Sequence, residues 1–200
     1  QVIVVTLDDP DDSLSEASSL GAISTSPTTI SGSLTPDTDV DVVRFSVTAG
    51  QVVDFDIDTL LNGGTGLGSY LRLFDAQGQQ LAFNNDAAAP GESQTGLDPY
   101  FRYTFASAGI YYLGVSNANN ILYNPVDGTD DTSGGANATG DYQLIVQAVN
   151  LTPTDPDDSL TEATSLGSIS ALPLTTSGTI SPDIDVDLYR FTVTAGQVVD

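Results

Sequence analysis

The chain has 200 residues, and its 27 acidic residues against four Arg, no Lys and no His give a formal net charge of −23. That charge excludes nucleic acid and anionic membranes as partners, because phosphate binding needs clustered Lys or Arg. An apolar fraction of 40% with eight Tyr and seven Phe is too high for a disordered acidic tail, so we expect a folded protein.

The missing residue types exclude most catalytic chemistry. Without His or Cys, neither a Ser-His-Asp nor a Cys-His arrangement can form, and without Lys there is no Schiff base. An aspartate pair could run glycoside hydrolysis, but the acids here fall in repeated, surface-like clusters, so we expect no enzyme. The lack of Cys excludes disulfides and fits a bacterial extracellular or cell-surface protein. No apolar run approaches the ~20 residues of a membrane span, so we expect no membrane insertion.

The first predicted element is a short helix. Ser13 and Glu16 have the Ser-x-x-Glu spacing of a capping box, and Gly21 stands at a plausible helix end. The same pattern returns at Ser159–Glu162, followed by Gly167. Each pattern predicts one or two helical turns.

Strand patterns dominate the rest of the chain. Apolar residues alternate with polar ones, as in Val43, Phe45 and Val47, and turn residues such as Gly50 and Gly78 separate the runs. The predicted strands cover residues 41–48, 52–58, 70–74, 81–83, 100–105, 110–115 and 142–146. Short strands between turns, with two long polar loops at 84–99 and 117–140, predict an all-β fold: an antiparallel β-sandwich of about eight strands per repeat.

The chain also contains an internal repeat. Residues 9–54 return at 155–200 with a constant offset of 146, and 32 of these 46 positions are identical. The period exceeds the roughly 20–50 residues of solenoids and is close to the ~100–150 residues of a domain, so we expect tandem domains. We expect the end of a preceding repeat plus a linker at 1–8, a complete repeat at 9–150, and a linker with the first part of another at 151–200. The chain is then a segment of a longer polypeptide.

Several of these segments resemble the bacterial pre-peptidase C-terminal domain. The resemblance is carried by residues 39–50 and 187–191, 69–75, 84–86, 109–115 and 140–144. They are most similar to the tandem, calcium-binding-type form of large cyanobacterial and other bacterial exoproteins. The resemblance implies a small jelly-roll-like β-sandwich, secreted or on the cell surface and accessory to another function. In related collagen-binding modules of clostridial collagenases, calcium is held by the acidic segment before the first strand.

The dense aspartates predict a calcium site. Calcium takes six to eight oxygen ligands, and Asp supplies several carboxylates from one short segment. The alternative is that Asp-Pro-Asp-Asp only solvates a linker and caps the short helix. The first candidate site and its repeat comprise Asp9, Asp11, Asp12, Asp37, Asp39, Asp41, Asp155, Asp157, Asp158, Asp183, Asp185 and Asp187.

A second, weaker candidate site brings together residues from one predicted strand and one loop: Asn84, Asn85 and Asp86 with Asp56, Asp58 and Asp98. Asn-Asn-Asp is equally typical of an ordinary turn. The alternating row Asp54, Asp56 and Asp58 can also serve to keep sheet edges from pairing.

Three functional hypotheses follow. The first is a non-enzymatic, calcium-stabilised repeat module of an extracellular structural protein, such as a stalk, filament or surface fibre, with neighbouring copies of the same repeat as partners. The alternative is a carbohydrate- or matrix-binding accessory module of a secreted enzyme or adhesin, using Tyr111, Tyr112 and Tyr123. The third is solvation at high salt, although that role favours Glu, which occurs only three times.

Overall fold

The computed structural model describes residues 11–59, 67–92, 98–133, 135, 139–150, 160–169, 173–178 and 186–199. The chain divides into two compact units, Gln1–Val149 and Asn150–Asp200. None of the described residues is helical, which confirms the all-β prediction. Consequently no helix in the described ranges is long and apolar enough to cross a membrane.

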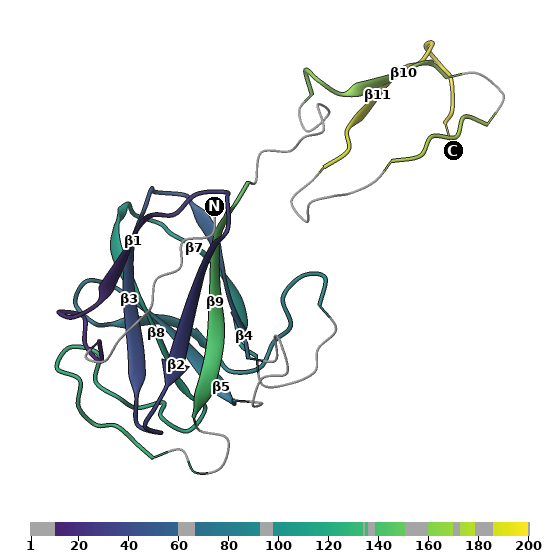
Figure 1. The fold of residues 1–200 in the computed structure, drawn as a ribbon. Coiled ribbons are helices and arrows are strands. Elements are labelled where there is room, and N and C mark those ends of the chain that lie inside the picture. The colour runs from purple at the N-terminus through teal and green to yellow at the C-terminus, as the bar shows by residue number, and fades with distance from the viewer. Residues whose placement is uncertain are drawn as a thin grey trace. The chain divides into compact units, whose positions relative to one another are not determined.

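The first unit is a sandwich of two sheets (Figure 1). The five-stranded sheet has the order β1-β3-β8-β5-β6 and the four-stranded sheet the order β2-β9-β4-β7. Pairing is antiparallel except between β1 and β3, which run parallel. The strands are β1 (Ser18–Ala22), β2 (Thr28–Leu34), β3 (Val40–Val47), β4 (Val52–Asp58), β5 (Ser69–Phe74), β6 (Gln80–Asn84), β7 (Tyr100–Thr104), β8 (Gly109–Asn117) and β9 (Gly140–Val149).

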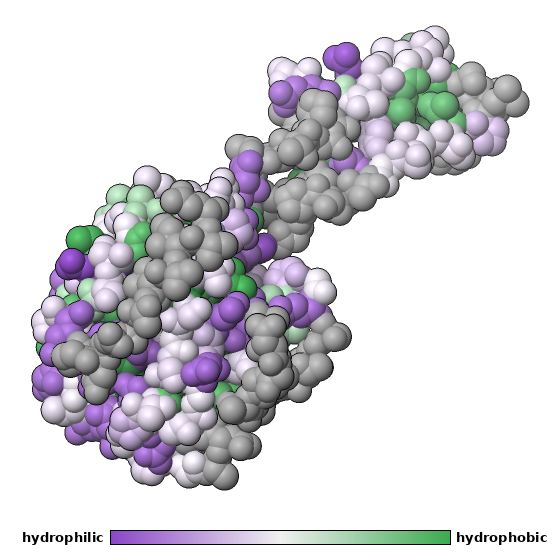
Figure 2. Space-filling view, viewed as in Figure 1, coloured by the Kyte–Doolittle hydropathy of each residue, from purple (hydrophilic) through white to green (hydrophobic). Residues whose placement is uncertain are grey.

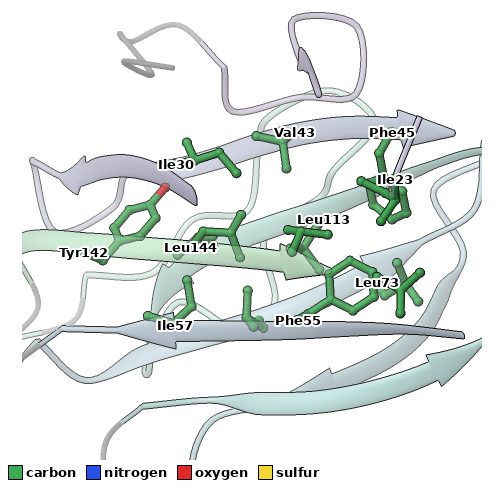
Figure 3. Close-up of a cluster of buried hydrophobic side chains, with 14 of the residues drawn as sticks. Ile23, Ile30, Val43, Phe45, Phe55, Ile57, Leu73, Leu113, Tyr142 and Leu144 are labelled. Atoms are coloured by element: carbon green, nitrogen blue, oxygen red, sulfur yellow. The ribbon is translucent and has the colours of Figure 1, made fainter. Parts of the chain in front are cut away.

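The core lies between the two sheets and follows the alternation of the sequence. Val43, Phe45 and Val47 of β3 are buried, and they face the buried Phe55 and Ile57 of β4. The rings of Phe45 and Phe55 lie 5.4 Å apart, so they join the two sheets directly. Figure 3 shows this row of side chains. The predicted inward faces of both strands are therefore confirmed.

A second apolar cluster covers the outer face of the five-stranded sheet. Tyr123 is only 1% exposed and packs edge-on against Phe74, with ring centroids 6.0 Å apart. The Arg72 guanidinium lies over both rings, and its Nη1 donates to the Tyr123 carbonyl at 2.8 Å. Tyr123 is therefore a core residue and cannot belong to the exposed tyrosine platform predicted above.

The predicted helix at Ser13–Glu16 is wrong: this segment is a turn. Ser13 Oγ donates to Glu16 Oε2 at 2.6 Å, so the two side chains bond each other instead of capping a helix. The Leu14 amide donates to the Pro125 carbonyl at 2.7 Å, a partner outside the segment. Gly21 lies within β1, where its positive φ of 78° accompanies an irregularity in the pairing with β3.

The second unit contains β10 (Thr164–Ser168) and β11 (Tyr189–Thr192), which pair in parallel. Every partner pair has the numbers of the β1–β3 pairing plus 146, including the irregularity at the glycine. Gln197 Nε2 donates to the Ile169 carbonyl at 2.8 Å, as Gln51 Nε2 donates to the Ile23 carbonyl at 2.9 Å. The strand pairing and the glutamine hydrogen bond of β10–β11 are thus the same as those of β1–β3.

Burial differs between the two units. Phe191 is 51% exposed, whereas its counterpart Phe45 is 1% exposed. Val193 and Val198 are exposed as well, and Figure 2 shows green apolar residues gathered on this unit. The second unit therefore presents to solvent the side chains that form a core in the first.

The contact between Tyr123 and Gly114 gives a test of the outer apolar cluster. A methyl group at Gly114 would overlap the buried Tyr123 hydroxyl and meet the Phe74 ring at 3.4 Å. We expect Gly114→Ala to destabilise the protein by about 1–3 kcal/mol and to lower Tm by roughly 2–10 °C. Gly109→Ala on the same strand is the control, because its methyl meets Tyr111 at an ordinary 3.6 Å. Equal melting temperatures of the two variants by circular dichroism would contradict this packing.

Candidate metal centres

The acidic segment that precedes β1 lies alongside β3. The Val42 amide donates to the Asp11 carbonyl at 2.9 Å, and the Val40 amide donates to Asp12 Oδ1 at 3.1 Å. These bonds bring Asp11 close to the two aspartates of the β3 region, Asp39 and Asp41. We call Asp11, Asp39 and Asp41 the β3 cluster.

The three carboxyl groups of the β3 cluster are buried, with exposures of 3%, 8% and 2% in chain order. Asp39 Oδ2 accepts a hydrogen bond from the Thr35 amide at 2.7 Å. Asp41 Oδ2 accepts one from the Tyr142 hydroxyl at 2.5 Å, and this bond joins β3 to β9 of the other sheet. Figure 3 shows Tyr142 at one end of the core row. The cluster therefore closes one end of the sandwich.

Burial raises the pKa of Asp41 to about 8, against the lowering effect of the Tyr142 hydroxyl. The charges of Asp11 and Asp39 add to the rise, as does a hydrogen bond to the Asp11 side chain. The buried charge of Asp41 can thus be neutralised in two ways, by a bound proton or by a cation.

Two buried asparagines hold the loop that leads into β3. The Asn117 side-chain amide donates to the Asp37 carbonyl, and Ser133 Oγ donates to Asp37 Oδ2. The Asn120 side-chain amide donates to the Thr38 carbonyl at 2.9 Å and to Asp131 at 3.0 Å. These buried amides fix the loop that leads into β3. The sequence marks them only as part of a polar loop, so they were not predicted.

Two other predicted members of the first site, Asp12 and Asp37, bond to β3 or lie in the loop that leads into it. Six more fall outside the described residues: Asp9, Asp155, Asp157, Asp158, Asp183 and Asp185. Asp187 is half-buried in the second unit, and there it occupies the position that Asp41 has in the first.

A different group of carboxylates lies on the outer face of the four-stranded sheet. Asp56 and Asp58 alternate along β4, and Glu92 comes from the connection between β6 and β7. One carboxylate oxygen from each lies within 4.8 Å of the other two, and this arrangement can hold a metal ion. We call Asp56, Asp58 and Glu92 the β4 cluster.

Electrostatics in the β4 cluster resemble those of the β3 cluster. Burial raises the pKa of Asp56 to about 7, and the charges of Glu92, Asp58, Asp98 and Asp54 raise it further. Burial also raises the pKa of Asp58, again with a contribution from Glu92. Glu92 was not predicted as a ligand, because nothing in a loop sequence shows which strand it folds against.

The remaining residues of the predicted second site take other roles. Asp98 Oδ1 accepts from the Thr59 amide at 3.2 Å and from its hydroxyl at 2.6 Å. Asn84 Oδ1 accepts from the Asp86 amide at 2.7 Å, the bond of an Asx turn. Asn85 and Asp86 are exposed. Of the six residues named for this site, the structure brings Asp56 and Asp58 together with Glu92.

Comparison with known proteins gives the family. The sequence pattern of the bacterial pre-peptidase C-terminal domain matches residues 39–117, the segment from Asp39 to the end of β8. The chain contains a pre-peptidase C-terminal domain. This domain is non-catalytic, although relatives that carry it are proteases.

Individual relatives are distant. A probable subtilase-type serine protease of Deinococcus radiodurans is 30% identical over 113 residues, which is 56% of this chain and 14% of that protein. The pre-peptidase C-terminal domain of a Bacillus anthracis collagenase is 22% identical, with 70% of this chain and 99% of that one covered and a TM-score of 0.40. Aeromonas hydrophila PliG, a periplasmic inhibitor of g-type lysozyme, is 14% identical, with coverage of 74% and 98% and a TM-score of 0.34.

The raised pKa values predict how stability depends on pH when no cation is present. The ordinary pKa of an Asp side chain is 3.8, whereas the folded values of Asp41 and Asp56 are about 8 and about 7. Between these limits the folded pre-peptidase C-terminal domain holds more protons than the unfolded chain, so the free energy of unfolding falls as pH rises. In EDTA we expect Tm to drop by several degrees from about pH 5 to about pH 8.

A double variant, Asp41→Asn with Asp56→Asn, is the control for this pH dependence. It removes both groups and should flatten the Tm profile over the same range. A wild-type Tm that rises toward pH 8 in EDTA, or an unchanged slope in the double variant, would contradict the assignment.

Proposed function

We propose that the first unit is a calcium-stabilised, non-enzymatic module of an extracellular protein, in which it acts as a spacer or an accessory to other domains. The observation that carries this proposal is the β3 cluster: three carboxyl groups from two segments, buried together at the end of the sandwich. Burying like charges is unfavourable unless something neutralises them. A cation does so and keeps both segments in place.

Calcium is the cation that fits these groups. The chain contains no His and no Cys, so a site here is built from oxygen alone, and hard cations take such ligands. Asp11, Asp39 and Asp41 would supply the carboxylates, and water or backbone carbonyls would supply the other oxygens. Extracellular calcium concentrations suit modules that bind in the 10⁻⁴–10⁻³ M range.

The spacer role rests on repetition. The sequence repeat of 146 residues and the matched register of β10–β11 support a second copy of the same module in this chain. Asp187 would then be the counterpart of Asp41, and neighbouring copies would be the partners. An extracellular location fits the family match and the protease relative. Tandem modules of this kind suit a stalk, a filament or a surface fibre.

One observation favours a second candidate function, the binding of a glycan or matrix component. Tyr70 and Phe83 stack with ring centroids 5.8 Å apart on the five-stranded sheet, and Phe83 is exposed. Aromatic side chains are enriched at binding interfaces, so this half-exposed pair could serve as a platform for a ligand. In this role Tyr70 and Phe83 replace the platform of Tyr111, Tyr112 and Tyr123.

Calcium should raise the melting temperature of the wild-type chain. Saturation at about 100 times Kd adds about 2.7 kcal/mol, or a Tm rise of roughly 5–10 °C. The measurement is differential scanning calorimetry in EDTA, in CaCl₂ and in NaCl of equal ionic strength. The NaCl arm separates a calcium site from solvation at high salt.

Asp41→Asn should abolish most of this calcium response. Asp141→Asn is the matched control, because Asp141 has the same charge, is exposed and precedes Tyr142 on β9. A calcium response of undiminished size in Asp41→Asn, or one that NaCl reproduces in the wild type, argues against the proposed role of the β3 cluster.

A further inference from the structure

We propose that the β4 cluster is a second calcium site, independent of the β3 cluster, and that the bound ion fastens the β6–β7 connection to the outer face of β4. Two of its ligands, Asp56 and Asp58, come from the rigid sheet, and the third, Glu92, comes from the connection. An ion shared by the three would hold together parts of the chain that are 34 or more residues apart in sequence.

The spacing of the carboxylates fits calcium. Calcium–oxygen distances are about 2.3–2.6 Å, so two ligands of one ion lie at most about 5 Å apart. The three oxygens of the β4 cluster lie within 4.8 Å of one another. Asp56 and Asp58 point to the same side because side chains on a strand alternate.

The buried Asp56 carboxylate supplies independent support. Asp56 is 9% exposed, and its Oδ1 atom is buried without a hydrogen-bond partner in the described part of the chain. Leaving such an acceptor unsatisfied is unfavourable, and more so when it is charged. A cation among the three carboxylates satisfies this atom.

The neighbouring Asp54 shows a different way of neutralising a carboxylate on this strand. Asp54 lies on the same face of β4, and Arg102 binds both of its oxygens, at 2.8 and 3.1 Å. The Tyr100 hydroxyl donates to it as well, at 2.9 Å. Asp54 is therefore neutralised from within the protein.

The chain has few basic side chains that could neutralise the β4 cluster. The sequence has four Arg and no Lys or His. Arg44 lies on β3 and Arg72 on β5, both in the other sheet, and Arg190 lies in the second unit. The fourth, Arg102, is engaged with Asp54. Positive charge for the three carboxylates of the β4 cluster is therefore expected from the solvent.

Among the described residues of the connection between β6 and β7, the backbone bonds other than those of Glu92 lie near its two ends. The Ala87 amide donates to the Asp98 carbonyl at 3.2 Å, and the Ile57 amide donates to the Pro99 carbonyl at 3.1 Å. At Glu92 the described hydrogen bonds are local, between Glu92 and Ala89. A bound ion would therefore hold Glu92 against the sheet. Without an ion, the charges of Asp56 and Asp58 would repel the Glu92 carboxylate.

The test uses the full chain and a glutamate-specific protease under conditions that spare Asp. The chain has three Glu, at positions 16, 92 and 162, so the mass of each fragment identifies the cut. We expect CaCl₂ to slow cleavage after Glu92 at least tenfold relative to EDTA, measured against cleavage after Glu162 in the same sample.

Variants assign the effect to the β4 cluster. Asp58→Asn should remove the protection of Glu92 by calcium, and Asp86→Asn, an exposed change on the same connection, should keep it. Asp58 is half-buried, so this substitution is milder than one at Asp56, and circular dichroism checks that the variant folds. No protection in the wild type, or full protection in Asp58→Asn, overturns the proposal. Equal protection by MgCl₂ overturns the assignment to calcium.

Asp41→Asn separates this site from the proposed function. The variant should lose the Tm response assigned to the β3 cluster and keep the calcium protection of Glu92. If the wild type shows the Tm response without protection of Glu92, the second site is wrong and the proposed function stands. If it shows protection without a Tm response that depends on Asp41, the proposed function is wrong and the second site stands.

Discussion

The hydrogen bond between Asp41 and Tyr142 is the contact on which the end of the sandwich depends, since it places a carboxyl group from one sheet against a hydroxyl from the other. Space for the Tyr142 ring comes from Gly32, its partner on β2, because a methyl group there would overlap the ring. The arrangement buries Asp41 beside Asp11 and Asp39. The unfavourable part of this arrangement is the repulsion among buried carboxylates. A proton or a cation at Asp41 would remove that repulsion.

The composition of the chain explains why the cation is expected from the solvent. In the first unit the structure shows one ion pair among the described residues, Arg102 with Asp54. The guanidinium of Arg72 is occupied in the packing of Phe74 and Tyr123. With no Lys and no His, the chain has few basic side chains for the buried carboxylates of the two clusters. With a net charge of −23, we expect the stability of the fold to depend on ions and on pH.

Local patterns in the sequence predicted much of the fold. Alternation predicted β3 through β9, and for β3 and β4 it also predicted the correct inward faces, because a half-buried strand needs a period of two. The Ser/Thr-rich β1 and β2 lack that alternation and were missed. The predicted helix failed because the Ser13 and Glu16 side chains bond each other. The same turn is also held from outside the local pattern, since the Leu14 amide donates to the Pro125 carbonyl.

The candidate sites were predictable to the extent that their ligands are close in sequence. Asp39 and Asp41 flank the start of β3, and the acidic segment before β1 was expected to meet them. Glu92 was missed because its approach to β4 depends on how a long connection folds. Tyr123 was assigned to a binding surface, whereas the structure shows it covering Gly114. Tertiary contacts of this kind leave no periodic trace in a sequence.

The protease relative is about seven times longer than the part this chain matches, so the module is one element of a larger protein there. The most direct test of calcium at the β3 cluster is a titration of the Asp41 carboxyl carbon by ¹³C NMR, with calcium and with EDTA. In EDTA the Asp41 signal should titrate with a pKa of about 8. In saturating calcium it should remain that of the ionised form down to at least about pH 5. The same titration curve in both conditions would show that a proton, and not calcium, neutralises Asp41.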